Sequence, residues 1–334
     1  MPVDPPAQLE ANTVPDRGLR SHGMRDLGPE EMQRFRAVER TFLEVTAAAG
    51  YREVRMPTIE PLHLYTAAGT LSPQALDRVY SFLDWDGWSG ERVVLRPDAT
   101  VAVARWYGDQ RDPGTQRLSY VQPVYRFAAD EDREVWQCGV ECFGAPAAQA
   151  DGELLALAQR FLAGLGITEV ECELAHAGLA RSAFAAAGLD AAEQLAAYDR
   201  LLEGDASLID DLAGRHPDGA AAIRLLAEVD GTSVGYIANL RAAMPGVIPG
   251  ADAALADLLG AAQALDAAGV PFRVRAGTAR NFEYYTGVTF RFLAGGRTVL
   301  GGGRYDRLSE TLGGASAPAC GWGADLLRLT GVAS

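Results

Sequence analysis

The stretch from residue 117 to residue 143 carries the polar side chains whose spacing best suits the binding of a small molecule. Two strand-like runs flank a short acidic turn, and the second run alternates apolar residues with Gln137, Gly139 and Glu141. Successive strand residues point to opposite faces, so one face is expected in the core and the other at a site. With Arg126 on the neighbouring strand and an open floor at Gly139, a small polar ligand would meet an amide, a carboxylate and a guanidinium. The alternative is an ordinary hairpin with a solvated polar face.

The composition limits the functions open to the chain. Its 334 residues, 48% of them hydrophobic, suffice for two domains or for one large domain with an insertion. Thirty basic against 44 acidic side chains leave a net charge of -14, the wrong sign for a protein whose main partner is a polyanion such as a nucleic acid. All the basic side chains are arginine, which excludes a Schiff-base lysine and a phosphate-binding lysine.

Cysteine usage and the absence of targeting signals predict a cytoplasmic protein. The four cysteines lie mostly within apolar runs and show no C-x-x-C spacing, so they are expected to be buried and reduced, and no metal site is predicted. Residues 1–22 are rich in proline and polar groups without the order of a signal peptide, which indicates a flexible arm. No apolar run approaches the roughly 20 residues of a membrane span, so no membrane contact is predicted.

A sheet and its flanking helices must position these polar residues. Strands are expected at residues 51–56, 79–85, 91–96, 168–174 and 271–275, and helices at residues 29–49, 101–107 and 152–163. Pro97 cannot donate to a ladder, so Asp98 and Thr100 lie at a strand end, where side chains point into a cleft. Asp98 could instead simply cap the following helix. Residues from about 177 to 267 are rich in alanine and leucine and broken by turn signals, which predicts a mainly helical insertion.

Four motifs in the same order resemble the class II aminoacyl-tRNA synthetases of the histidine-specific lineage, over residues 23–329. The helix, strand and proline ending at residue 57 are similar to motif 1, the run YRF followed by REVWQCGVE to motif 2, and GWGADLLRL to motif 3. The run RNFEYYTG is similar to the signature RGLDYYTG of the histidine-specific branch, and GGGRYD matches a further family run. The resemblance implies an α+β fold with an antiparallel sheet flanked by helices, and a dimer formed through the motif 1 region.

The same resemblance implies a histidine pocket. LRPDAT is similar to the family segment that holds the amino group of histidine. The family's contacts to the ammonium, the carboxylate region and the imidazole correspond, in that order, to Asp98 and Thr100, Gln137 and Arg280, and Glu141 and Tyr285. Such a set is suited to free histidine, because each polar group of the ligand needs a partner once it leaves water.

The nucleotide half of the family's site is depleted in this sequence. Arg126 of motif 2 and Arg328 of motif 3 remain as vestiges. Ala128 and Leu327, however, stand where the family has glutamates, and the short acidic loop of motif 2 would repel a triphosphate. The chain stops at Ser334, so an anticodon-binding domain is expected to be absent, and aminoacylation and tRNA binding are expected to be lost.

This combination resembles the synthetase paralogues that serve as regulatory subunits of ATP phosphoribosyltransferase. In that family the subunit has no catalysis and no cofactor of its own; it assembles with a short catalytic partner, enables the first step of histidine biosynthesis and confers feedback inhibition by histidine. The effector would bind either in the retained pocket or at the subunit interface. The alternatives are a truncated histidyl-tRNA synthetase, another enzyme that activates an amino acid, and a scaffold without a ligand.

Overall fold

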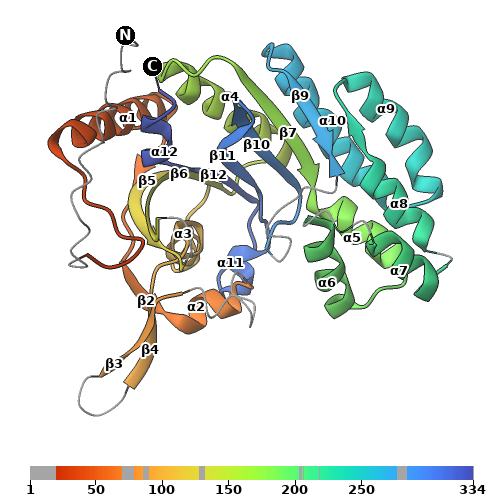
Figure 1. Ribbon diagram of the computed structural model, residues 1–334, viewed down its shortest axis with the longest axis horizontal. Coiled ribbons are helices and arrows are strands. Elements are labelled where there is room, and N and C mark those ends of the chain that lie inside the picture. Colours follow the sequence, from red (N-terminus) through yellow and green to blue (C-terminus); the bar gives the residue numbers. More distant parts are fainter. Residues whose placement is uncertain are drawn as a thin grey trace, which may run out of the picture.

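The protein is built on one large sheet with helices on both sides and a small sheet that projects as an arm (Figure 1). The computed structural model describes residues 20–69, 79–85, 90–127, 132–202, 205, 207–217, 219–276 and 284–333. The large sheet has nine strands in the order β1-β5-β6-β12-β11-β10-β7-β9-β8. All neighbours are antiparallel except β1 with β5 and β7 with β9. The α+β fold predicted from the sequence is confirmed.

Strands and helices are numbered separately in chain order. The strands of the large sheet are β1 (Arg52–Glu53), β5 (Gln116–Tyr125), β6 (Glu134–Phe143), β7 (Val170–His176), β8 (Asp230–Gly231), β9 (Phe272–Arg275), β10 (Val288–Ala294), β11 (Arg297–Arg304) and β12 (Ala319–Asp325). The arm consists of β2 (Ile59–Pro61), β3 (Ser81–Trp85) and β4 (Gly90–Leu95). The helices are α1 (Pro29–Ala48), α2 (Leu62–Ala67), α3 (Ala99–Gly108), α4 (Ala147–Gly164), α5 (Ala177–Ala186), α6 (Ala191–Leu202), α7 (Leu208–Arg215), α8 (Ala220–Glu228), α9 (Val234–Ala243), the 3-10 helix η2 (Met244–Gly246), α10 (Ala251–Ala267), α11 (Leu308–Thr311) and α12 (Leu326–Thr330).

Helix α1 forms where the apolar spacing predicts it and covers one face of the sheet with α4. Pro29 occupies its first turn. The Glu31 side chain accepts a hydrogen bond from the Gly28 amide at 3.2 Å, which gives the backbone N–H at the N-cap a partner. Phe42 packs edge-on against Phe161 of α4 and is fully buried. The opposite face carries a second core, built with α2 and α3. The two faces of the sheet therefore have separate cores.

The strand predicted at residues 51–56 is shorter than expected, because a buried arginine takes the carbonyls beyond it. The Arg96 guanidinium donates to the carbonyls of Met56 at 2.7 Å, Pro57 at 2.6 Å and Pro123 at 2.7 Å, and the residue is 0% exposed. The Met56 amide likewise donates to the Gln122 side chain at 3.1 Å, so the backbone beyond Val54 bonds side chains rather than the neighbouring strand. Arg96 thereby fixes the end of β4 and the start of α3, where the predicted site begins.

The segment between β7 and β9 forms helices α5 to α10, which lie together at one side of the large sheet (Figure 1). The helix α10 packs against α4, α9 and β7, so these helices continue the layer that covers the sheet. Within the part of the chain that the structure describes, no helix is both long and apolar enough to cross a membrane.

Candidate ligand-binding pocket

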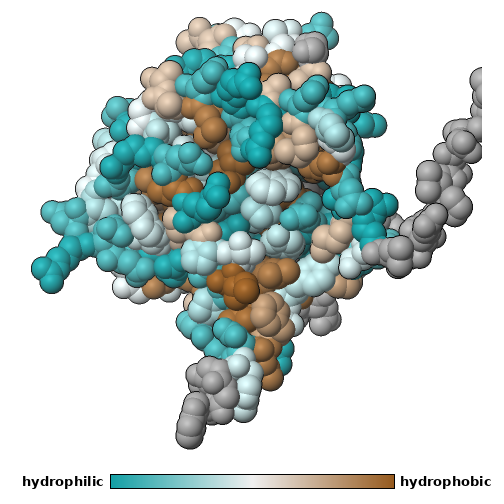
Figure 2. Space-filling model, turned by 90° about the vertical axis from the view of Figure 1, so that its left-hand side faces the viewer, coloured by the Kyte–Doolittle hydropathy of each residue, from teal (hydrophilic) through white to brown (hydrophobic). Residues whose placement is uncertain are grey.

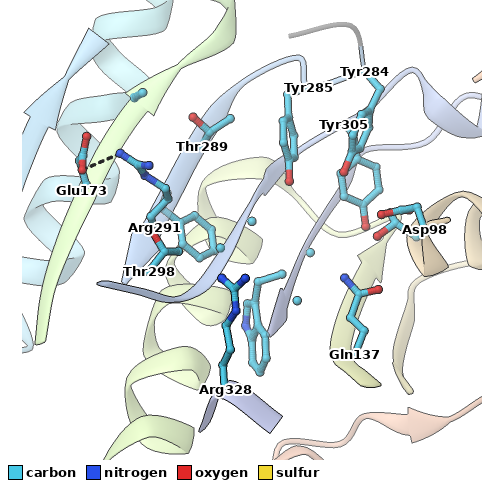
Figure 3. Close-up of a pocket in the computed structure, with 18 of the residues that line it drawn as sticks. Asp98, Gln137, Glu173, Tyr284, Tyr285, Thr289, Arg291, Thr298, Tyr305 and Arg328 are labelled. Carbon is cyan, nitrogen blue, oxygen red and sulfur yellow. Dashed lines mark hydrogen bonds and ion pairs between the residues drawn. The ribbon is translucent and has the colours of Figure 1, made fainter. Parts of the chain in front are cut away.

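A cavity of about 290 Å³ lies on the face of the large sheet opposite α1 and α4 (Figure 3). Its floor contains Gly301 of β11 and Gly321 and Gly323 of β12. A Cβ atom at Gly321 would overlap the Glu141 carboxylate, and one at Gly323 would lie 2.7 Å from the Gln137 amide nitrogen. Only glycine at these positions lets the polar side chains of β6 lean over β12, and the open floor lets a ligand approach the sheet.

Glu141 lies beneath the wall of the cavity and organises three hydroxyl groups. Its carboxylate accepts hydrogen bonds from Thr100 at 2.7 Å, from Tyr120 at 3.2 Å and from Tyr305, while the residue is only 1% exposed. Burial raises the pKa of Glu141 to about 8, although the hydroxyl donors oppose this shift. Thr100 and Tyr305 line the cavity directly, so the carboxylate fixes the orientation of the groups that a ligand would meet.

Tyrosine side chains form the wall opposite Gln137 (Figure 3). The rings of Tyr284 and Tyr285 stack with centroids 4.5 Å apart, and Tyr305 lies 5.8 Å from Tyr284. Burial raises the pKa of Tyr285, so its phenol stays neutral and can donate or accept a hydrogen bond. The carbonyl oxygen of Gln137 is buried and has no hydrogen-bond partner within the described residues. A donor on a bound ligand would satisfy this oxygen.

Asp98 combines the two roles considered for it. It is the N-cap of α3 and accepts from the Val101 amide at 3.2 Å, which confirms the capping interpretation. It also lines the cavity, where its second carboxylate oxygen lies 3.7 Å from the Arg126 guanidinium. Arg126 is held in turn by donating to the Pro97 carbonyl at 2.8 Å. A ligand ammonium reaching Asp98 would meet a carboxylate already placed by the helix.

The arginine side chains that line the cavity are balanced by carboxylates. Arg291 of β10 pairs at 2.8 Å with Glu173, its cross-strand neighbour on β7 (Figure 3). Arg328 lies 3.5 Å from Asp325, which caps α12 and whose pKa burial raises. Together with the pair of Arg126, each arginine that lines the cavity has a carboxylate within 4 Å. The cavity therefore offers little uncompensated positive charge to a polyanion.

The structure brings most of the predicted site residues together. The cavity is lined by Asp98, Thr100, Arg126, Gln137, Tyr285 and Arg328. Glu141 lies behind this lining, and Arg280, like Ala128, falls outside the described residues.

The predicted floor at Gly139 is wrong, because Tyr120 of β5 is its cross-strand partner and the phenol occupies that space. Sequence reasoning also missed Tyr305, Glu173 and Arg291. Tyr305 lies inside the recognised run GGGRYD, which was the available signal for it.

The cysteines are buried, as predicted, and none is in a disulfide: Cys138, Cys142, Cys172 and Cys320. Among the described residues, no group of three or more histidine, cysteine or acidic side chains is arranged to hold a metal ion.

Comparisons with known proteins agree on one family. Residues 23–329 match the family described as histidyl-tRNA synthetase. An ATP phosphoribosyltransferase regulatory subunit of Dehalococcoides mccartyi is 43% identical over 93% of this chain and 76% of that protein. A histidine–tRNA ligase of Dechloromonas aromatica is 32% identical over 92% of this chain and 71% of that protein. A crystal structure of an ATP phosphoribosyltransferase regulatory subunit/histidyl-tRNA synthetase from Bacillus halodurans has a TM-score of 0.80 at 25% identity and covers 96% of this chain and 84% of that chain.

The antiparallel sheet, its flanking helices and the glycine-floored cavity define a protein of the class II aminoacyl-tRNA synthetase type. Within that class, the chain belongs to the histidyl-tRNA synthetase family, in the branch of the ATP phosphoribosyltransferase regulatory subunits.

Proposed function

We propose that this chain is the non-catalytic regulatory subunit of ATP phosphoribosyltransferase, required in the cytoplasm for the first step of L-histidine biosynthesis and for its feedback regulation by histidine. The observation that carries this proposal is the chemistry of the cavity lining, which suits an amino acid better than a triphosphate. Asp98 and Gln137 present a carboxylate and an amide to an amino acid in the cavity, whereas each arginine that lines the cavity lies beside a carboxylate of the protein. The similarity to the Dehalococcoides regulatory subunit supports the same conclusion.

Free histidine is the effector that we propose for this cavity. In this proposal Asp98 accepts from the ammonium and the amide nitrogen of Gln137 donates to the carboxylate region, while Tyr285 and the hydroxyl groups held by Glu141 surround the imidazole. Binding can shift the assembly between active and inhibited arrangements only by the difference in affinity for the two, typically about 1 to 3 kcal/mol.

The partner is a short-form catalytic subunit, and reconstitution tests the assignment. The short-form ATP phosphoribosyltransferase of the same genome is expected to co-purify with this chain and to gain activity from it. Added histidine is expected to inhibit the reconstituted complex. A catalytic subunit that is fully active alone and does not bind this chain would contradict the proposal.

A histidine-activating enzyme is the second candidate, favoured by the histidine–tRNA ligase relative and by the persistence of Arg126 and Arg328 in the cavity. Such an enzyme would catalyse histidine-dependent exchange between ATP and pyrophosphate. We expect no exchange, because Arg126 and Arg328 lie beside Asp98 and Asp325 and would have to leave them to bind phosphate. tRNA is not a partner in this proposal, in keeping with the net charge of -14.

A dimer through the motif 1 region is also part of the proposal, and the exposed apolar surface of the arm, which follows that region in the sequence, supports it. Leu83 and Trp85 of β3 are 56% and 68% exposed, and Phe82, on the other face of the strand, is 41% exposed. Figure 2 shows apolar side chains running along the projecting arm. A small sheet that exposes apolar residues on both faces is expected to pack against a partner surface.

Charges on this arm are therefore expected to break the dimer. The double substitution Leu83→Asp and Trp85→Asp should halve the mass measured by sedimentation equilibrium, because it places two carboxylates in an apolar contact. The matched control is Val247→Asp, at an exposed apolar residue of the helical segment (43% exposed), which should leave the mass unchanged. An unchanged mass in the double variant would place the self-association surface elsewhere.

A further inference from the structure

The first helix of the segment between β7 and β9 holds three consecutive carbonyl groups at the pocket. The Ala177 amide of α5 donates to the Gly287 carbonyl at 2.9 Å. One turn later, the Arg181 guanidinium donates to the carbonyls of Tyr285 at 2.8 Å and Thr286 at 3.0 Å. All three acceptors belong to the segment that enters β10 and carries the tyrosine wall. One helix thus fixes the backbone of a pocket residue.

The local sequence of α5 permits this close approach. His176 caps the helix by accepting from the Leu179 amide at 3.3 Å, and its other ring nitrogen lies 3.4 Å from Asp257 of α10. A Cβ atom at Gly178 would lie 2.9 Å from the His176 ring and 3.5 Å from the Thr286 carbonyl oxygen. Glycine therefore leaves room for the His176 ring that caps α5, while the Thr286 oxygen would lie at ordinary contact distance.

The residues from Tyr285 to Gly287 also contact residues at the pocket, on the side away from α5. The Thr286 hydroxyl donates to the Asp306 carboxylate at 3.1 Å, and Asp306 directly follows Tyr305, the donor to Glu141. The Tyr285 ring lines the cavity and stacks on Tyr284. Tyr285, Thr286 and Gly287 therefore connect α5 to the ligand-binding surface. Because their carbonyls are bonded to α5, a movement of α5 would move the backbone of Tyr285.

We infer that Arg181 is a positioning residue through which ligand binding in the pocket is coupled to the helical segment α5 to α10. This inference rests on the proposed histidine site. Because Arg181 bonds backbone carbonyls and is not among the described residues that line the cavity, it acts by holding Tyr285 in place. Histidine that binds against a correctly placed Tyr285 stabilises the docked position of α5, and by linkage the docked helix raises the affinity for histidine.

Two measurements on Arg181→Ala test the coupling. Calorimetric titration is expected to show a histidine affinity about tenfold lower than that of the wild type, within the usual range for coupled sites. Hydrogen exchange of residues 177–186 is expected to slow on addition of histidine in the wild type and to change little in the variant. A purely structural loss would lower the protection of α5 without removing its response to histidine.

A conservative variant and a control variant complete the test. Arg181→Lys keeps the charge and one donor to the carbonyls, so it should recover part of both responses even if the alanine variant folds poorly. Arg224→Ala, at an exposed arginine of α8, should match the wild type. Wild-type affinity with an intact exchange response in both Arg181 variants overturns the inference alone. A wild-type chain that gives no heat with histidine overturns the proposed histidine site and the inference with it.

Discussion

Replacing Glu141 by alanine is expected to lower the affinity for histidine by about two orders of magnitude, equivalent to about 2.8 kcal/mol. The carboxylate is the common acceptor for Thr100, Tyr120 and Tyr305. Without it, buried hydroxyl groups lose their partner, at about 1 to 3 kcal/mol for each group left unsatisfied, and two lining residues lose their orientation. Calorimetric titration of the isolated chain with histidine measures the effect.

The matched control for this prediction lies on the same strand. Glu134 of β6 accepts a hydrogen bond from Tyr125 at 3.0 Å and does not line the cavity. Glu134→Ala should therefore bind histidine like the wild type. Equal affinity in Glu141→Ala and the wild type would move the effector site away from this cavity, to the subunit interface, without affecting the regulatory assignment.

Arg304→Ala should destabilise the fold by about 3 to 5 kcal/mol, the usual cost of breaking a buried ion pair. Arg304 is 4% exposed and donates to Asp151 at 2.6 Å and to Asp306 at 2.8 Å. It also donates to the Ala147 carbonyl at 2.8 Å, so it ties β11 to the start of α4. Its removal leaves two neighbouring carboxylates without their cation, and burial already raises the pKa of Asp151. Urea unfolding followed by circular dichroism gives the loss directly.

Arg241 is the control for this prediction, because it forms a similar ion pair that is exposed to solvent. Arg241 binds both carboxylate oxygens of Asp252, at 2.9 Å and 3.4 Å, at the surface. Arg241→Ala should barely change the unfolding midpoint, because water and salt screen an exposed pair. Equal losses in the two variants would show that burial does not determine the value of these pairs.

Periodicity in the sequence correctly predicts what lies within a single element. The alternation in β6 places Cys138 and Val140 in the core and Glu141 on the pocket face, as the structure has them. The helix expected at residues 29–49 is α1, because its apolar spacing and Pro29 are local signals. The family motifs locate most of the cavity lining for the same reason, since each of them is a continuous run.

The sequence does not reveal which residues far apart in the chain come into contact. The sequence predicts open space above Gly139, because it does not show that the cross-strand neighbour of Gly139 is Tyr120, whose ring fills that space. The ion pair between Glu173 and Arg291 joins residues 118 positions apart, so no local pattern indicates it. The strand at residues 51–56 is cut short by Arg96, a side chain from outside that strand. Each of these differences arises from a tertiary contact that overrides a local preference.

The burial of all four thiols has a practical consequence for studying this fold. Cys138 and Cys142 on β6, Cys172 on β7 and Cys320 on β12 are each at most 1% exposed. A thiol-labelling reagent can reach these sulfur atoms only when the central strands separate or the covering helices lift away. The labelling rate of the unmodified chain thus reports how often the sheet opens, and a bound effector that holds the sheet closed would slow it.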